Sequence, residues 1–249
     1  MARYRARLMY DGTDFHGSQY QPDVRTVQGE LENGLRKLGW SGTAVKFAGR
    51  TDAGVHASGQ VIAFDHEWNH SEEDLARALN AVRPEDMAAG DVAQVRRDFE
   101  PRYDALARTY RYQIRCSPER NPLLDRYAWR VWPEVNLKSI NSAASALVGR
   151  HDFAAFGNPH QPGGSTIRQM ESAAWVESDP LCEFILVGNA FLYHMVRHIV
   201  QVLVEIGQGK LSAAAVADYL ENPDGPSAPG LAPARGLRLE KVSYPDGKN

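Results

Sequence analysis

Segments of period two alternate with segments of helical period along this chain, and their order constrains the fold more than any other feature. Arginines alternate with apolar residues from Arg3 to Tyr10, and polar with apolar residues from Thr109 to Arg115, which predicts two strands with a cationic face. In 26–38 and from Ser71 onward, leucines at helical spacing follow a residue suited to cap a helix N-terminus. Because these elements lack a regular βαβ order, we expect an α+β fold: a mostly antiparallel, mixed sheet with helices packed on it.

The remaining elements are expected from the same patterns and from the Gly and Pro residues that bound them. Helices are expected at 137–147 and 190–206, with a short one from Ser212. Strands are expected at 43–48, 61–64, 127–132 and 237–242, and as a pair over 170–187 that turns at 178–180. The Pro-, Gly- and Ala-rich segment 222–236 is expected to be irregular.

The order of elements is similar before and after about residue 105. We therefore expect two α+β halves that flank a central cleft: residues 1–105, and residues 106–249, which complete the cleft. With 249 residues, of which 43% are apolar and 24% charged, the chain is long enough to bury a substantial core and has an ordinary globular composition.

The formal net charge of −3 excludes a generally basic nucleic-acid coat, but the charge is unevenly distributed. Segment 65–91 holds eight acidic residues and two arginines, whereas segment 96–120 holds seven arginines and four acidic residues. Arginines interleaved with tyrosines suit phosphate contact and base stacking. A solvated strand face is the favoured explanation for most of these arginines, so composition alone does not indicate RNA binding.

Cys116 and Cys182 are too few for a disulfide scaffold or a multi-cysteine zinc site, and we expect two free thiols in a reducing compartment. The N-terminal residues lack the apolar run of a signal peptide, and polar residues interrupt the most apolar stretch, 184–204. We therefore expect a cytoplasmic protein without a membrane span.

The segment GRTDAGVHASG, residues 49–59, is the strongest candidate for a chemical site. Its three glycines permit a positive φ or the close approach of another backbone. Asp52 follows Arg50 by two positions, and a nearby guanidinium favours the ionised carboxylate, which could act as a nucleophile or electrostatic stabiliser. An Asp that caps a turn and pairs with an Arg is also common in inert loops, so the residues alone leave both interpretations open.

Other known site patterns are missing or incomplete. The 49–59 segment lacks the Gly-Lys-Ser/Thr of a Walker motif and the spacing of a dinucleotide-binding fingerprint, and no nucleophile elbow is present. His194 and His198 have the spacing of zinc ligands on a helix, but Met195 stands where a metalloprotease needs its Glu and no third ligand is evident. Core or cleft-lining histidines are the favoured interpretation.

Several motifs in one order resemble the tRNA pseudouridine synthase A family, whose members isomerise uridines at positions 38 to 40 of the tRNA anticodon arm. The most specific motif is FAGRTDAGVHASGQV over residues 47–61. The others are YDGTDFHGSQYQP (10–22), RTYRYQI (108–114), GRHDFAAF (149–156), NAFLYHMVRHIV (189–200) and APARGLRLEKVSYP (232–245), so the resemblance covers nearly the whole chain.

The resemblance implies a role for five residues. Asp52 would be the catalytic aspartate, Tyr110 would stack on the target uracil, and Arg197 would pair with the aspartate. Arg50 would help to hold the extruded nucleotide, and Leu237 would pack in the pocket. The family further implies tRNA as the partner, a homodimer, no cofactor and no metal. Two chemical routes stay open: attack of the aspartate on C1′, or removal of a C2′ proton to give a glycal.

The chain departs from the family pattern at Ser18, in place of a bulky aromatic residue, and at Glu100 and Pro101, in place of a His-Ala pair. Gln201 and the stretch 223–233 also differ, whereas Asp52, Tyr110 and Arg197 are retained. These departures concern tRNA docking. The loop 157–168 has a composition typical of a mobile segment. A protein that keeps this fold but only binds RNA is the alternative from another functional class.

Overall fold

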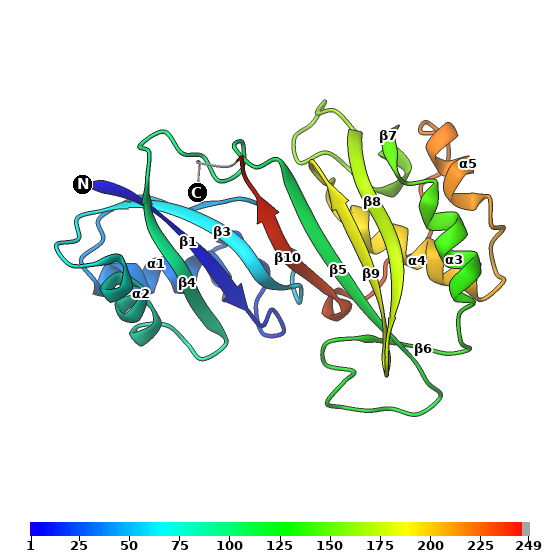
Figure 1. The fold of residues 1–249 in the computed structure, drawn as a ribbon, viewed down its shortest axis with the longest axis horizontal. Helices are drawn as coiled ribbons and strands as arrows, with labels where there is room; N and C mark the ends of the chain where they lie inside the picture. Colours follow the sequence, from blue (N-terminus) through cyan, green and yellow to red (C-terminus); the bar gives the residue numbers. More distant parts are fainter. Residues whose placement is uncertain (246–249) are drawn as a thin grey trace. The chain divides into compact units, whose positions relative to one another are not determined.

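The computed structural model describes residues 1–245, and the packing of the chain divides it into two compact units (Figure 1). The N-terminal unit comprises Met1–Leu106 together with Leu239–Asn249, of which residues 246–249 lie outside the described part. The C-terminal unit comprises Ala107–Arg238. Ten strands and five α-helices lie within the described residues.

The strands of the N-terminal unit have the order β4-β1-β3-β10. Their bounds are Met87–Val95 for β4, Ala2–Tyr10 for β1, His56–His66 for β3 and Leu237–Ser243 for β10, which belongs to this unit from Leu239 onward. β1 is antiparallel to both β3 and β4, and the two-residue strand β2 (Lys46–Phe47) also pairs with β3. A Cβ atom on Gly59 would lie 2.7 Å from the Glu240 carbonyl carbon, so β10 passes β3 closely at a position that only glycine permits.

Helices α1 (Val27–Lys37) and α2 (Glu72–Ala81) supply the rest of the N-terminal core. Thr26 caps α1 by accepting from the Gly29 N–H, and Ser71 and Asp74 form a capping box at the start of α2. Each helix buries a pair of leucines at positions four apart, and alternate residues of β1 are buried as well. The apolar residues that follow the period-two and helical patterns are therefore buried in the core of this unit.

In the C-terminal unit the strand order is β5-β9-β8-β7, all antiparallel, with β6 running parallel beside β5. The strands are β5 (Ala107–Cys116), β6 (Trp129–Val131), β7 (Gly149–Asp152), β8 (Ile167–Ser178) and β9 (Leu181–Gly188). The helices are α3 (Leu137–Ser145), α4 (Met195–Gly207) and α5 (Ala215–Glu221). Eight of the thirteen residues of α4 are buried, as its apolar sequence predicts.

The predicted α+β class with a mixed, mostly antiparallel sheet is confirmed, but several local predictions were wrong. The helix predicted from residue 190 begins at Met195, because His194 has a φ of 64° and the Tyr193 N–H bonds to the Asn158 carbonyl instead. β3 begins at His56, inside the segment predicted to be a loop. The predicted strand 43–48 is reduced to β2. Two strands, β4 and β7, were not predicted; β4 is rich in Ala and Gly, which have weak strand propensity.

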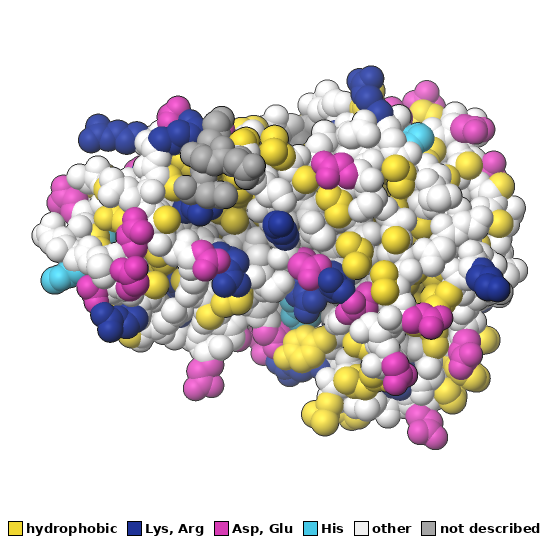
Figure 2. All heavy atoms as spheres, viewed as in Figure 1, with side chains coloured by type: hydrophobic (Ala, Val, Ile, Leu, Met, Phe, Trp, Pro, Cys, Tyr) yellow, Lys and Arg dark blue, Asp and Glu magenta, His cyan; other side chains and the backbone are white. Residues whose placement is uncertain are grey.

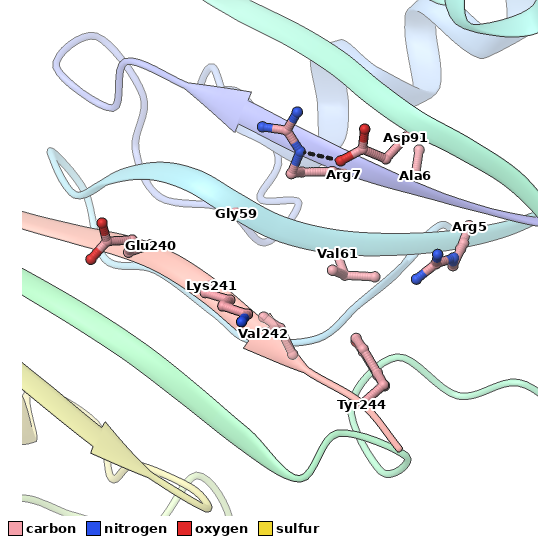
Figure 3. A pocket seen from close by; sticks show the side chains of 10 residues that line it. All are labelled: Arg5, Ala6, Arg7, Gly59, Val61, Asp91, Glu240, Lys241, Val242 and Tyr244. Carbon is pink, nitrogen blue, oxygen red and sulfur yellow. Dashed lines mark hydrogen bonds and ion pairs between the residues drawn. The ribbon is translucent and has the colours of Figure 1, made fainter. Parts of the chain in front are cut away.

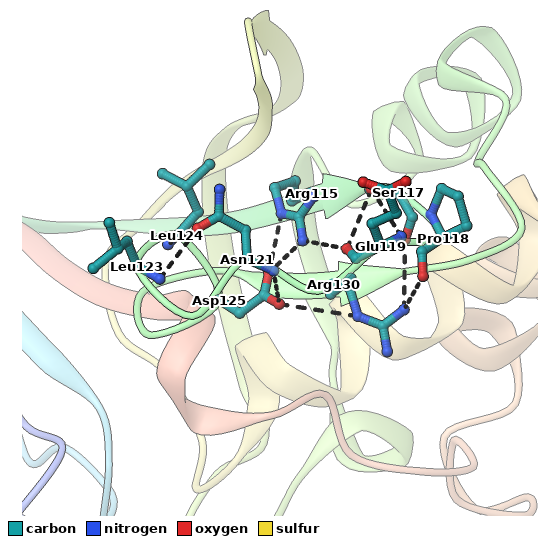
Figure 4. Close-up of polar contacts among 9 residues, drawn as sticks. All are labelled: Arg115, Ser117, Pro118, Glu119, Asn121, Leu123, Leu124, Asp125 and Arg130. Carbon is teal, nitrogen blue, oxygen red and sulfur yellow. Dashed lines mark hydrogen bonds and ion pairs between the residues drawn. The ribbon is translucent and has the colours of Figure 1, made fainter.

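Between β5 and β6 the chain forms a loop, residues 117–128, that has little regular structure but an extensive polar network (Figure 4). The Arg115 guanidinium donates to Asp125 Oδ1 at 2.8 and 3.0 Å and to the Glu119 carbonyl at 2.7 Å. Asp125 also accepts from the Asn121 N–H, and the Asn121 side chain accepts from the N–H groups of Leu123 and Leu124. A largely buried ion pair thus fixes the 117–128 loop.

Candidate active site

Arg50 and Asp52 lie on a turn, residues 48–55, that connects β2 to β3; we call it the 48–55 loop. The Val55 N–H donates to the Asp52 carbonyl at 3.1 Å, which closes a β-turn. Gly54 occupies the third position of this turn with a φ of 77°, a conformation that favours glycine, as its sequence position suggested. Asp52 is half-buried and Arg50 is exposed. The turn therefore has a fixed backbone and holds the Asp52 carboxylate close to the protein surface.

The first half of the 48–55 loop is fastened to β3. The Ala48 N–H donates to the Val61 carbonyl at 2.8 Å. The fully buried Gln60 side chain bonds to both main-chain groups of Gly49: its Nε2 donates to the carbonyl at 2.8 Å, and its Oε1 accepts from the N–H at 3.2 Å. The hydrogen bonds of residues 48 and 49 therefore extend the pairing of β2 with β3 beyond the end of β2.

The residue before Asp52 is held by the segment that follows β1. The Ser18 N–H donates to the Thr51 carbonyl at 3.0 Å, and the Thr51 N–H donates to Ser18 Oγ at 2.8 Å. The hydroxyl groups of Tyr10 and Thr51 are 2.8 Å apart. Burial raises the pKa of Tyr10 to about 12, so its phenol is neutral at physiological pH and remains available for hydrogen bonding.

Two glycines allow the segment 11–18 to approach the 48–55 loop. A Cβ atom on Gly12 would lie 2.5 Å from the Val55 carbonyl carbon, a distance that packed side chains do not tolerate. Gly17 has a φ of 92°, and a Cβ atom there would lie 3.0 Å from the Thr51 carbonyl oxygen. The Gly12 N–H also donates to His56 Nδ1 at 3.0 Å. The two segments therefore meet main chain against main chain.

In the C-terminal unit, Tyr110 lies on β5 opposite Leu186 of β9. Its ring is buried and meets Phe191 edge to face, with ring centroids 4.8 Å apart and planes at 74°. The tyrosine that the sequence nominated as a stacking residue therefore has a fixed ring orientation.

Arg197 and Leu237 are both connected to the irregular segment before β10. Arg197, in the first turn of α4, donates from Nε to the Ala232 carbonyl at 2.8 Å, and Leu237 is buried at the start of β10. Tyr112 organises this region: its hydroxyl donates to the Pro233 carbonyl at 2.8 Å, and a Cβ atom on Gly236 would lie 2.6 Å from its ring. Burial raises the pKa of Tyr112, an effect that the charges of Arg197 and Arg235 reduce.

The arginine-rich stretch 96–120 is largely engaged within the protein. Arg96 pairs with Asp98 and Asp104, Arg111 with Glu183, and Arg115 with Asp125. Arg108 is buried and donates to the Asn189 carbonyl at 2.7 Å. At least four of the seven arginines therefore have structural partners, and Arg108 and Arg115 are buried, so these arginines do not form the solvated strand face that the sequence favoured.

A cavity of about 310 Å³ lies in the N-terminal unit beside β1, β3 and β10 (Figure 3). Three basic residues and two acidic residues line it, and Arg7 donates to Asp91 at 2.5 Å. Basic and acidic side chains are interspersed on the face that Figure 2 shows. The lining charges nearly balance, so the cavity has no clear preference for a charged ligand.

The structure thus places Arg50 and Asp52 on one loop of the N-terminal unit, and Tyr110, Arg197 and Leu237 in the core and α4 region of the C-terminal unit. Neither Tyr10 nor Gln60 was predicted as a site residue from the sequence, and Ser18 stood out only as a departure from the family pattern. The one available signal was a polar glutamine directly before the apolar run 61–64. Within residues 1–245, no three His, Cys, Asp or Glu side chains are grouped to hold a metal ion. No helix in that range has both the length and the apolar character of a membrane span.

Comparison with known proteins gives a match over most of the chain. The family model described as tRNA pseudouridine synthase matches residues 6–104 and 143–245. Among curated proteins, the tRNA pseudouridine synthase A of Geobacillus sp. (strain WCH70) is 40% identical over 244 residues, covering 97% of this chain and 98% of the relative. The protein of the same name from Geobacillus kaustophilus (strain HTA426) is 42% identical, covering 98% of this chain and 95% of the relative.

A third relative, the tRNA pseudouridine synthase A of Myxococcus xanthus, is 39% identical over 249 residues, covering 99% of this chain and 94% of the relative. Among solved structures, a chain in the crystal structure of a Cbf5-Nop10-Gar1 complex aligns with 81% of this chain and 54% of its own length. Its TM-score is 0.33 and its sequence identity 10%, a similarity too low to support an argument about this chain.

Proposed function

The chain belongs to the tRNA pseudouridine synthase family, and from this premise we propose that it converts uridine to pseudouridine at positions 38 to 40 of the tRNA anticodon arm, with Asp52 as the catalytic carboxylate. The enzyme is an isomerase: the bond between uracil N1 and ribose C1′ breaks, a new bond joins C1′ to C5, C5 loses its proton and N1 gains one. No atom is gained or lost, so the reaction needs no co-substrate.

The target base is stacked in the anticodon arm, so it must leave the stack before the carboxylate can reach the ribose. Extrusion costs a few kcal/mol, which phosphate contacts and an aromatic platform offset. Asp52 then acts on the sugar, either by attack on C1′ or by removal of the C2′ proton. Both routes need a carboxylate at a fixed place, and the ordered 48–55 loop with its half-buried Asp52 supports this role.

The other four site residues receive the roles that the family resemblance implies. Tyr110 stacks on the target uracil; its buried ring, fixed edge to face by Phe191, supports this assignment. Arg197 pairs with the catalytic carboxylate, and Leu237 packs in the pocket. Arg50, exposed on the 48–55 loop, holds the extruded nucleotide. We expect the enzyme to act without metal or cofactor, as a homodimer, in the cytoplasm where tRNA is used.

The single observation that carries the proposal is the family match over nearly the full chain with an aspartate at the ordered turn of the matching loop. Replacing Asp52 by Asn keeps the shape and removes the charge. We expect kcat to fall by about 10²- to 10⁴-fold or more, with tRNA affinity largely retained, because the carboxylate itself repels the RNA backbone. Asp14→Asn, an exposed substitution in the same unit, is the matched control and should leave kcat unchanged.

The cellular test maps pseudouridine in tRNA from cells that lack this protein. Complementation with the wild-type chain should restore the modification at positions 38 to 40, and complementation with Asp52→Asn should not. Restoration by Asp52→Asn would refute the catalytic role of Asp52. A protein that merely binds RNA would restore none of the modification in either case.

A further inference from the structure

We infer that Tyr10, Ser18 and Gln60 form a buried hydrogen-bond frame that positions Asp52 for the reaction. This inference rests on the proposed catalytic role of Asp52. The three residues are positioning residues: their polar groups bind the main chain and side chain of residues 49 and 51 and need no contact with the substrate. We call them the loop frame.

Gln60 is the first member of the loop frame. Its amide is fully buried in β3, and an amide in such surroundings is unfavourable unless its polar atoms are bonded. Both of them are bonded, to the carbonyl and to the N–H of Gly49. The Gln60 side chain also lies near enough to the Tyr10 hydroxyl to lower its pKa against the effect of burial, which links Gln60 to Tyr10.

Tyr10 and Ser18 complete the loop frame at Thr51. The Tyr10 hydroxyl bonds to Thr51 Oγ1, and Ser18, which is only 1% exposed, accepts from the Thr51 N–H through its hydroxyl. The second bond is a property of the serine side chain, because residue types without a short polar group have no acceptor at that place. Removing the hydroxyl leaves a buried N–H without that acceptor, which is costly.

The frame acts on Asp52 through the backbone. It fixes the residues three positions and one position before Asp52, and the bond from the Val55 N–H to the Asp52 carbonyl fixes the chain on the other side. A carboxylate that reacts with a ribose must lie within a few tenths of an ångström of its productive position. Because every member lies in the N-terminal unit, the frame orients Asp52 within that unit before tRNA arrives.

Two pairs of variants test the frame. Tyr10→Phe removes only a hydroxyl group, and its control is Tyr4→Phe on the same strand, where the ring is equally buried but packs against Phe64. Ser18→Ala also removes only a hydroxyl group, and its control is Ser41→Ala at an exposed position. We expect each frame variant to lower kcat by about 10- to 100-fold, with unchanged tRNA dissociation constant and KM. Ser18→Thr, which keeps the hydroxyl, should recover part of the loss.

The melting temperature of every variant is measured together with kcat. If Ser18→Ala fails to fold, Tyr10→Phe still tests the frame, because it keeps the ring that fills the core. Wild-type kcat in both folded frame variants, with Asp52→Asn inactive, would overturn the frame and leave the proposed function intact. A kcat loss that follows the unfolded fraction and disappears at lower temperature would also overturn it. An active Asp52→Asn would instead refute the proposed function itself.

Discussion

Substituting Gly12 by Ala tests how tightly the position of the 48–55 loop controls the reaction. A Cβ atom at position 12 would lie 2.5 Å from the Val55 carbonyl carbon, whereas ordinary contacts begin at 3.4 Å. The Val55 carbonyl oxygen lies nearer still, so the Val55 peptide must move by at least about 0.9 Å, the difference between these two distances. Val55 donates to the Asp52 carbonyl, so the displacement passes directly to the turn that carries the carboxylate.

The expected consequences are different in size for catalysis and for stability. A misplacement of about 1 Å costs about 10²-fold in rate, which predicts that kcat falls by about 100-fold. Forcing extra atoms into a packed site costs about 1–3 kcal/mol, so the free energy of unfolding should fall by that amount and the protein should remain folded. Catalysis therefore fails before the fold does.

The assay measures kcat with saturating tRNA and the free energy of unfolding in urea. Gly90→Ala is the control, because a Cβ atom there meets only the end of the flexible Arg7 side chain, at 3.2 Å. This control should keep its kcat. A folded Gly12→Ala protein with the kcat of the wild type would refute the reasoning, since it would show that the carboxylate tolerates a displaced backbone.

Two further predictions concern stability. Arg115→Met removes one partner of an ion pair whose side chains are 9% and 16% exposed, so the free energy of unfolding in urea should fall by about 2–3 kcal/mol. The control is Arg77→Met, because the Arg77 side chain is 79% exposed and its loss should leave the free energy of unfolding almost unchanged. Equal losses in the two variants would contradict the prediction. Burial, aided by the charge of Arg197, lowers the pKa of His198 below its usual 6.5, so the unfolded chain takes up its proton first and stability falls as the pH drops below 6.5. Urea midpoints at pH 7.5 and 5.5 should therefore differ less in His198→Gln than in the wild type. Burial also lowers the pKa of His66, but His66 is present in both proteins and adds the same pH dependence to each. An equal pH dependence of the two proteins would count against the role of His198.

The sequence predicts those elements whose signals are local. The alternating arginines predict β1, and the leucines at helical spacing after Thr26 and Ser71 predict α1 and α2. These predictions succeed because hydrophobic periodicity and helix capping depend only on residues that are near one another in the sequence. The turn around Gly54 was also accessible, since a glycine between Asp52 and Val55 marks a positive φ.

What the sequence could not predict depends on contacts between distant residues. The start of α4 is set by His194 and by a bond from Tyr193 to Asn158, which no local pattern records. The loop frame joins Ser18 to Thr51 across 33 positions, and Tyr10 to Thr51 across 41. The sequence around each of these residues shows no motif or periodicity that marks it, and its partner becomes evident only when the chain is folded.

The place of β10 next to β3 matters while the protein is being made. The ribosome completes the first 106 residues of the N-terminal unit well before it reaches Leu239, and at about 5–20 residues per second the interval is on the order of ten seconds. During that time the edge of β3 is open except where β2 pairs with it, and its unpaired N–H and C=O groups can capture strands of other chains. The glycine at position 59 keeps a space there for β10, so this edge stays open until the chain has been synthesised through Ser243.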